Sequence, residues 1–143
     1  MKRVRKEHQR KATRGALYAA MAILLLVTPS FASSATSGRT VTVGVASNGK
    51  EITLKSGDEL VVRLAGNATT GYRWAIVSKP KALTLIKSTY VTSPPGRIGQ
   101  GGTFSFHLRA VSGRGTLKLA YRRPWEKGKA PAQSFSIKVR VKR

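Results

Sequence analysis

The sequence predicts one all-β domain, an antiparallel sandwich of seven to eight strands behind an export signal. Three observations support this prediction. From Arg39 to the C-terminus, apolar residues recur at every second position, which is the period of a half-buried strand. Gly, Pro, Asn and Asp fall between the alternating runs, where turns are needed. The 143-residue chain leaves room, once its front end is removed, for one domain of the size of an immunoglobulin-like sandwich.

Residues 1–32 have the features of a signal peptide. Seven basic side chains form a positive front: Lys2, Arg3, Arg5, Lys6, Arg10, Lys11 and Arg14. The apolar run of residues 16–28 that follows is shorter than the about 20 residues that span a membrane. We expect cleavage after Ala32, or else after Ala35, and a periplasmic or extracellular location. Because the basic front is long, an uncleaved anchor stays open as the alternative. Residues 33–38 form a polar, flexible leader.

The domain that we place at residues 39–143 contains a regular series of alternating runs. In its first half, the residues expected to face inward are Val41, Val43 and Val45; Ile52 and Leu54; Leu60, Val62 and Leu64; and Tyr72, Trp74 and Ile76. In its second half they are Leu83 and Leu85; Phe104, Phe106 and Leu108; Leu117, Leu119 and Tyr121; and Phe135, Ile137, Val139 and Val141. Polar residues occupy the alternate positions, so two sheets should pack their apolar faces together.

The composition limits the function classes. Lys and Arg number 27 against 5 Asp and Glu, giving a formal net charge of +22. This charge exceeds what solubility requires of a small domain, and most of it lies beyond residue 32, so an anionic surface is expected nearby. There is no Cys, which excludes disulfides, thiolate nucleophiles and thiolate metal sites. Packing alone must hold the fold.

The inventory of ionisable residues argues against an enzyme. Beyond the signal, His107 is the only His and Asp58 the only Asp, so neither a metal cluster nor a catalytic triad is expected. His107 falls on the polar face of a strand, where a solvated side chain is the expectation. Asp58 and Glu59 point to opposite faces, and their expected role is a turn and a strand start. No cofactor is predicted.

Three short motifs lie between strands and are candidates for a binding site. They comprise Asn67, Ala68, Thr69, Thr70, Gly71 and Tyr72; Gly99, Gln100, Gly101 and Gly102; and Arg123, Pro124 and Trp125. Each motif alone is equally well explained as a hairpin turn, in which Gly71 or Gly101 and Gly102 would supply positive φ. Trp74 shares an inward face with its neighbours and is expected in the core. Trp125 follows a proline among charged residues, which indicates an exposed binding anchor.

In this order and spacing, the three motifs resemble the chagasin family of cysteine-peptidase inhibitors. The family shows an Asn-Pro-Thr-Thr-Gly-aromatic loop, a Gly-x-Gly-Gly loop and an Arg-Pro-aromatic loop at one end of an eight-stranded immunoglobulin-like barrel. The resemblance covers the chain from about Arg39 to the C-terminus. It departs at Ala68, where the family usually has proline.

The resemblance implies a reversible, tight-binding inhibitor of papain-like, cathepsin L-like cysteine peptidases. Thr69 and Thr70 would enter the catalytic cleft, and stiff β-branched residues there would resist an extended, cleavable conformation. Gly101 and Gly102 would adopt positive φ and approach one wall of the partner. Trp125 would bring an apolar face and Arg123 a forked donor to the other wall. No residue would be catalytic.

The charge supports a second class, an exported cationic β-sandwich that binds anionic polymers or the cell surface. The residues that suggest this class are Arg73, Lys79, Lys81, Lys87, Arg97, Arg109, Arg114, Lys138, Arg140, Lys142 and Arg143. A merely solvated face explains them equally well. No nucleic acid is expected, because aromatics are nearly absent among the basic residues. Nothing in the sequence requires more than a monomer.

Overall fold

The computed structural model describes residues 38–94 and 99–143. The elements are β1 (Thr40–Val43), the 3-10 helix η1 (Val45–Ser47), β2 (Glu51–Lys55), β3 (Glu59–Gly66), the 3-10 helix η2 (Ala68–Thr70), β4 (Arg73–Ser78), β5 (Leu83–Thr92), β6 (Gly102–Ala110), β7 (Gly113–Arg122) and β8 (Gln133–Lys142). The expected signal peptide, residues 33–37 of the leader and Arg97 lie outside the described residues. Within the described ranges, no helix is long and apolar enough to cross a membrane.

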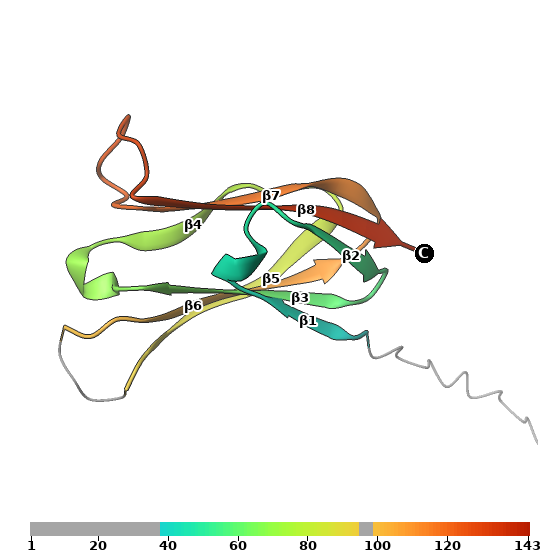
Figure 1. The fold of residues 1–143 in the computed structure, drawn as a ribbon, viewed down its shortest axis with the longest axis horizontal. Helices are drawn as coiled ribbons and strands as arrows, with labels where there is room; N and C mark the ends of the chain where they lie inside the picture. Colours follow the sequence, from blue (N-terminus) through green and yellow to red (C-terminus); the bar gives the residue numbers. More distant parts are fainter. Residues whose placement is uncertain (1–37, 95–98) are drawn as a thin grey trace, which may run out of the picture. The chain divides into compact units, whose positions relative to one another are not determined.

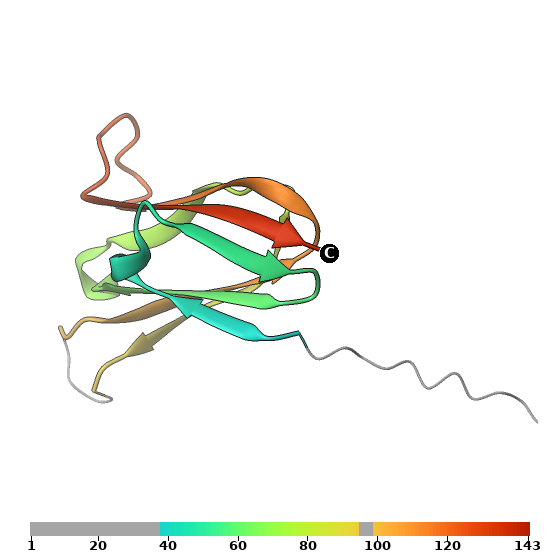
Figure 2. The ribbon, with the colours of Figure 1, turned by 45° about the vertical axis from the view of Figure 1, so that its right-hand side comes forward.

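Two four-stranded sheets make up the fold, which confirms the predicted all-β sandwich. One sheet has the strand order β1-β3-β6-β5, and the other has the order β2-β8-β7-β4 (Figure 1). Seen from a second direction, the two sheets lie face to face (Figure 2). Their inward residues form one core, in which Leu60, Leu83, Leu108 and Ile137 are fully buried. Trp74 is only 7% exposed, as expected of a core residue, and its indole N–H donates to the Ala65 carbonyl at 2.9 Å.

Two strand pairs are parallel, which the sequence did not predict. β1 pairs in parallel with β3 and β2 with β8, whereas the other four pairs are antiparallel. The chain passes from one sheet to the other between β1 and β2, and again between β2 and β3. β1, β2 and β3 therefore cannot pair in succession as hairpins. β1 and β2 instead each add in parallel to the edge of their own sheet.

The predicted burial is wrong for two of the residues that were expected to face inward. Val45 lies in η1 and is 76% exposed, because the chain leaves β1 at Gly44 to cross to the other sheet. Leu85 is 41% exposed although it lies opposite the buried Leu108, because β5 is an edge strand with no neighbour on its outer side. The register between β5 and β6 shifts just after it, between Leu85 and Lys87, and a bulge in an edge strand disturbs one neighbour only.

The two predicted turn acids have separate roles. The Asp58 carboxylate is buried and accepts hydrogen bonds from the backbone N–H groups of Arg39 (2.9 Å) and Lys55 (2.8 Å), so it holds the turn before β3. Glu59 points outward and pairs with His107 Nδ1 at 2.5 Å. His107 was expected to be solvated; it is instead half-buried against this carboxylate on the neighbouring strand.

Candidate functional site

The three motifs lie at one end of the sandwich, which we call the loop end (Figure 1). Residues 67–72 connect β3 to β4, residues 99–102 precede and begin β6, and residues 123–125 follow β7. β3 and β5 both run antiparallel to β6, so they end on the same side. β7 runs antiparallel to β4, which starts there, so β7 ends there too. Strand direction alone thus gathers the three connections.

The first loop is a single turn of 3-10 helix capped by Asn67. The Asn67 Oδ1 accepts from the Thr69 backbone N–H at 3.1 Å and from the Thr69 hydroxyl at 2.6 Å. The Thr70 hydroxyl donates to the Asn67 carbonyl at 2.6 Å. Asn is a favoured cap because its short side chain reaches the free N–H groups of the first turn. Both threonine hydroxyls are therefore bonded within the loop, although both residues are exposed.

Asn67 also joins this loop to the strands and to the second motif. Its backbone N–H donates to the Tyr121 hydroxyl at 2.7 Å, and its Nδ2 donates to the Gly99 carbonyl at 3.1 Å. The Ala68 N–H lies 3.4 Å from the Tyr90 hydroxyl. One asparagine thus fixes the loop's inner geometry and its position against two other segments.

Gly71 and Trp125 bring the first and third motifs into contact. Gly71 has φ of +79°, which side-chain-bearing residues rarely adopt. A Cβ on this glycine would also collide with the Cη2 atom of the Trp125 ring. The tryptophan nevertheless remains 66% exposed, as the sequence indicated. One edge of the ring rests on the first loop, and most of its surface is free.

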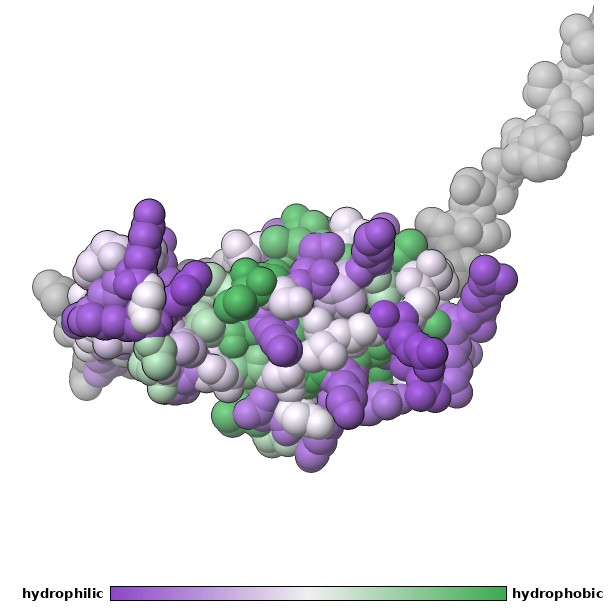
Figure 3. Space-filling view, turned by 90° about the horizontal axis from the view of Figure 1, so that it is seen from above, coloured by the Kyte–Doolittle hydropathy of each residue, from purple (hydrophilic) through white to green (hydrophobic). Residues whose placement is uncertain are grey.

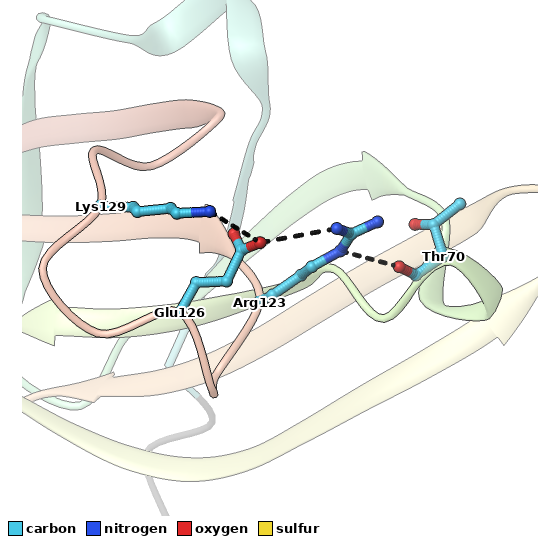
Figure 4. A network of polar contacts seen from close by, with 4 residues as sticks. All are labelled: Thr70, Arg123, Glu126 and Lys129. Carbon is cyan, nitrogen blue, oxygen red and sulfur yellow. Dashed lines mark hydrogen bonds and ion pairs between the residues drawn. The ribbon is translucent and has the colours of Figure 1, made fainter.

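Arg123 braces the first loop from the third motif (Figure 4). Its Nε donates to the Thr70 carbonyl at 3.2 Å, and its guanidinium lies 4.6 Å from the centre of the Tyr72 ring. Its Nη1 lies 3.6 Å from Glu126 Oε1, which Lys129 Nζ also approaches at 3.5 Å. The sequence assigned the Arg123 fork to a partner; in the structure it holds the site together.

The glycine motif differs from its expected conformation. Gly99 has φ of +82°, but the predicted positive φ at Gly101 and Gly102 is wrong. Close packing inside the protein requires glycine at position 102 and leaves little room for a side chain at position 101. A Cβ at Gly102 would collide with the Val91 carbonyl, and one at Gly101 would lie 3.2 Å from the Gly66 carbonyl.

Gln100 borders a surface hollow between the first and second motifs. The hollow has a volume of about 560 Å³, and Asn67, Ser93 and Tyr121 line it as well. Among the described residues, no group of three or more His, Asp or Glu could hold a metal ion. The hollow's lining offers amide, hydroxyl and backbone groups, which suit contact with a peptide better than acid–base chemistry.

Sequence reasoning missed three residues that shape the site. Tyr121 was assigned to a strand only and Tyr90 was given no role, yet their hydroxyls reach the first loop. Glu126 is one of the charged residues that follow Pro124, and the sequence indicated no role for it, yet it pairs with Arg123. Tyr121 ends an inward strand face, and a buried phenol needs a hydrogen-bond partner. A tyrosine instead of a phenylalanine at such a position was therefore the sequence signal for a bond to a nearby loop.

Comparison with known proteins agrees with this arrangement. The model of the chagasin family peptidase inhibitor I42 matches residues 53–139. Amoebiasin-1 from Entamoeba histolytica is 33% identical over 95 residues, which cover 66% of this chain and 92% of that protein. Chagasin from Trypanosoma cruzi is 26% identical over 102 residues, which cover 67% of this chain and 93% of chagasin.

A solved structure gives the same answer for the fold. The crystal structure of the cysteine protease inhibitor EhICP2 from Entamoeba histolytica aligns with 73% of this chain and 96% of its own, with a TM-score of 0.66 and 27% identity. The eight strands, the three motifs at one end and these matches lead to one conclusion: the chain belongs to the chagasin family of peptidase inhibitors.

Proposed function

We propose that the protein is a reversible, tight-binding inhibitor of papain-like cysteine peptidases, including those of the cathepsin L type, and that its loop end blocks the active-site cleft. The observation that carries the proposal is the joining of the three motifs by direct contacts. Asn67 bonds to Gly99, Arg123 bonds to Thr70, and Trp125 rests on Gly71. A surface fixed in this way loses little freedom when it binds, which favours affinity.

The first loop is suited to enter a peptidase cleft without being cleaved. A substrate must lie extended across the catalytic groove, whereas Ala68–Thr70 form a 3-10 turn. Extending the turn would break the hydrogen bonds that both threonine hydroxyls make to Asn67. β-branched side chains stiffen the turn further. The loop would thus occupy the cleft in a shape that does not present a scissile bond.

The other two motifs would contact the cleft walls. Trp125 offers a large exposed ring, and aromatic residues of this kind often dominate binding energy. Gln100 and Gly101 line the hollow beside Asn67, and this hollow would admit a protruding side chain of the peptidase. Inhibition is occlusion, no residue is consumed, and the protein is not an enzyme.

A titration of papain and of a cathepsin L-type peptidase tests this function. Every core residue lies between Val43 and Val141, so residues 33–143 hold the whole described core and suit the assay. Activity should fall linearly to zero at one inhibitor per active site, and should return after dilution. Intact inhibitor should be recovered by mass spectrometry. Full peptidase activity at excess inhibitor, or cleavage between residues 67 and 72, would contradict the proposal.

We also propose that the protein acts outside the cytoplasmic membrane, with residues 1–32 removed on export. The support is the basic front followed by a short apolar run. The intact mass of the exported protein tests this directly. A mass that begins at Ser33 or Thr36 is expected, and a mass that includes Met1 would overturn cleavage.

A further inference from the structure

The outward face of the sheet β2-β8-β7-β4 concentrates basic side chains; we call it the basic face. Its outward positions carry Lys55, Arg73, Arg114, Lys118, Arg122, Lys138, Arg140 and Lys142, all of them exposed. Within these four strands, the only acidic residue is Glu51, which pairs with Arg140 at 3.1 Å. The loop end and the basic face are different surfaces of the domain.

The other sheet does not share this charge. The outward positions of β1-β3-β6-β5 carry the basic residues Arg63, Lys87 and Arg109 together with the acidic Glu59. Glu59 stands directly opposite Arg109 across the β3–β6 pair, an arrangement of opposite charges that stabilises a sheet. The strong positive charge of the strands is therefore uneven, and one face has most of it.

Like charges stand directly opposite each other three times on the basic face. The opposed pairs are Arg73 and Arg122, Arg114 and Arg140, and Lys55 and Lys142. Directly opposed like charges destabilise a sheet, so folding alone gives no reason for this pattern. An anion that lies between two opposed cations removes their repulsion. Glu51 already neutralises Arg140 in part, whereas no ion pair within the described residues involves Arg73 and Arg122 or Lys55 and Lys142. These two pairs therefore indicate a surface that a bound anionic partner would stabilise.

The basic pairs form a track along the strands. The ends of the track, Arg114 and Arg122, are eight positions apart on β7, which corresponds to about 27 Å at about 3.4 Å per residue. A hollow of about 240 Å³ lies on this face, and its lining includes three basic residues, Arg114, Lys138 and Arg140, together with the acidic Glu51. Looking down on this sheet, hydrophilic side chains stand among neutral and hydrophobic ones over the middle of the face, and they are dense toward the end that carries the C-terminus (Figure 3).

We propose that the basic face binds a linear anionic polysaccharide through its sulfate or carboxylate groups. A track about three strands wide and several charges long fits an extended chain with repeated anions. Arginine forks match planar or tetrahedral oxyanions with two donors at once. The outward positions of the four strands carry no aromatic residue, so bases of single-stranded nucleic acid would find nothing on which to stack. The polymer would hold the protein while leaving the loop end free.

Heparin, used as the polysaccharide probe, tests the proposal with two matched triple variants. Arg114→Thr with Lys118→Thr and Lys138→Thr removes three cations from the basic face. Arg63→Thr with Lys87→Thr and Arg109→Thr removes three from the other sheet and leaves the same net charge. The first variant should bind heparin at least about tenfold more weakly, with a salt dependence shallower by about two charges, whereas the second should bind like the parent. Equal losses in both variants would overturn the proposal.

Two further measurements keep the test decisive if a triple variant unfolds. Glu51→Gln removes the single acid of the basic face at an exposed position and should strengthen heparin binding; unchanged or weaker binding would contradict the proposal. Single-stranded DNA and anionic lipid vesicles serve as competitors matched in charge. Either one binding more tightly than heparin would assign the face to that partner instead.

Papain inhibition by the first triple variant should equal that of the parent, because the substituted residues lie outside the loop end.

Discussion

The two ends of strand β3 are built in opposite ways. At its start, the buried Asp58 carboxylate binds two backbone N–H groups, and Gly57 and Asp58 exchange backbone hydrogen bonds with Ala110. We call this the turn end. At the other end of β3, Asn67 directs an exposed loop whose contacts are made mainly by side chains. The turn end is closed and buried, whereas the loop end is fixed yet open to a partner.

This difference shows how a small domain without disulfides separates stability from binding. At the turn end, the Asp58 carboxylate before β3 accepts hydrogen bonds from the residue before β1 and from the last residue of β2. Water hardly reaches this carboxylate, since Asp58 is 4% exposed. The loop end keeps its backbone fixed through Tyr121 and Arg123 while Trp125 stays in solvent. Substitutions at the turn end should therefore change unfolding, and those at the loop end should change inhibition.

The largest effect on unfolding is expected from Trp74→Ala. Its ring lies in the core beneath the loop end, next to Tyr121, with 5.3 Å between ring centroids. Removing the ring leaves a cavity and should lower the free energy of unfolding by about 3–5 kcal/mol. Urea denaturation measures this change. A loss below about 1 kcal/mol would show that the aromatic cluster does not support the loop end.

Asp58→Asn should destabilise the turn end in a pH-dependent way. Hydrogen bonds from the backbone N–H groups, with that of Lys55 first, hold the pKa of Asp58 below its ordinary value, although burial opposes them. The ionised form is therefore favoured by folding. Its contribution is fully present above the unfolded-state pKa of about 4, and is lost as pH falls through the lowered folded-state pKa.

The melting temperature of Asp58→Asn and parent, followed from pH 7 into acid, measures this effect. The variant should melt lower at pH 7, and the difference should shrink below about pH 4. Papain inhibition at neutral pH and a temperature where both proteins are folded should be the same. A constant difference in melting temperature at every pH would contradict the role of the charge.

At the loop end, Trp125→Ala should weaken papain inhibition while leaving unfolding unchanged. Loss of an exposed aromatic anchor costs about 2 kcal/mol of binding, or about 30-fold in the inhibition constant. Urea denaturation serves as the control. Inhibition equal to that of the parent would remove Trp125 from the binding surface.

A smaller effect is expected from Arg123→Lys. Lysine keeps the charge but lacks the planar fork that bonds Thr70 and covers the Tyr72 ring. The looser first loop should weaken inhibition by about 1 kcal/mol, or about fivefold. Arg122→Lys, the same change one position earlier on an exposed outward site, is the matched control and should inhibit like the parent. Equal inhibition by both variants would mean that Arg123 does not position the loop.

The smallest effect on inhibition, and the only gain in inhibition, is expected from Ala68→Pro. Asn67 has φ −125° and ψ 100°, which is extended backbone, and the residue before proline favours extended over helical backbone. Proline would restrict the free loop by about 0.4–1 kcal/mol and tighten inhibition up to about fivefold. Proline has no backbone N–H, so the variant would lose only the long 3.4 Å hydrogen bond from the Ala68 N–H to the Tyr90 hydroxyl. A looser inhibition constant would indicate that the bound loop differs from the structure described.

Local alternation predicted the strands, but the crossings between sheets depend on distant contacts. Val45 continued a valine alternation, yet the next turn is set by Asn48, whose Oδ1 accepts from the Ser136 N–H 88 residues away. The β5 bulge at Leu85 depends likewise on the partner strand β6. A sequence window contains neither partner, so it could not locate these departures or the parallel pairs.

The candidate site shows the same limit. The motif residues were identifiable from their order and spacing. The exposure of Trp125 was predictable because this residue follows a proline and has charged neighbours. The bracing by Arg123 and the need for glycine at position 102 were not, because Thr70 and the Val91 carbonyl lie on other segments. Residue types thus indicated which loops matter, and packing decided how each residue is used.

Hydrogen exchange of the inhibitor, free and bound to papain, tests the contrast between the two ends most directly. Backbone amides of residues 67–72, 99–102 and 123–125 should exchange more slowly in the complex. Amides of residues 55–59 and of the strands in the sheet β2-β8-β7-β4 should exchange at unchanged rates. Protection centred on the turn end or on the sheet, with the loop end unaffected, would contradict the account.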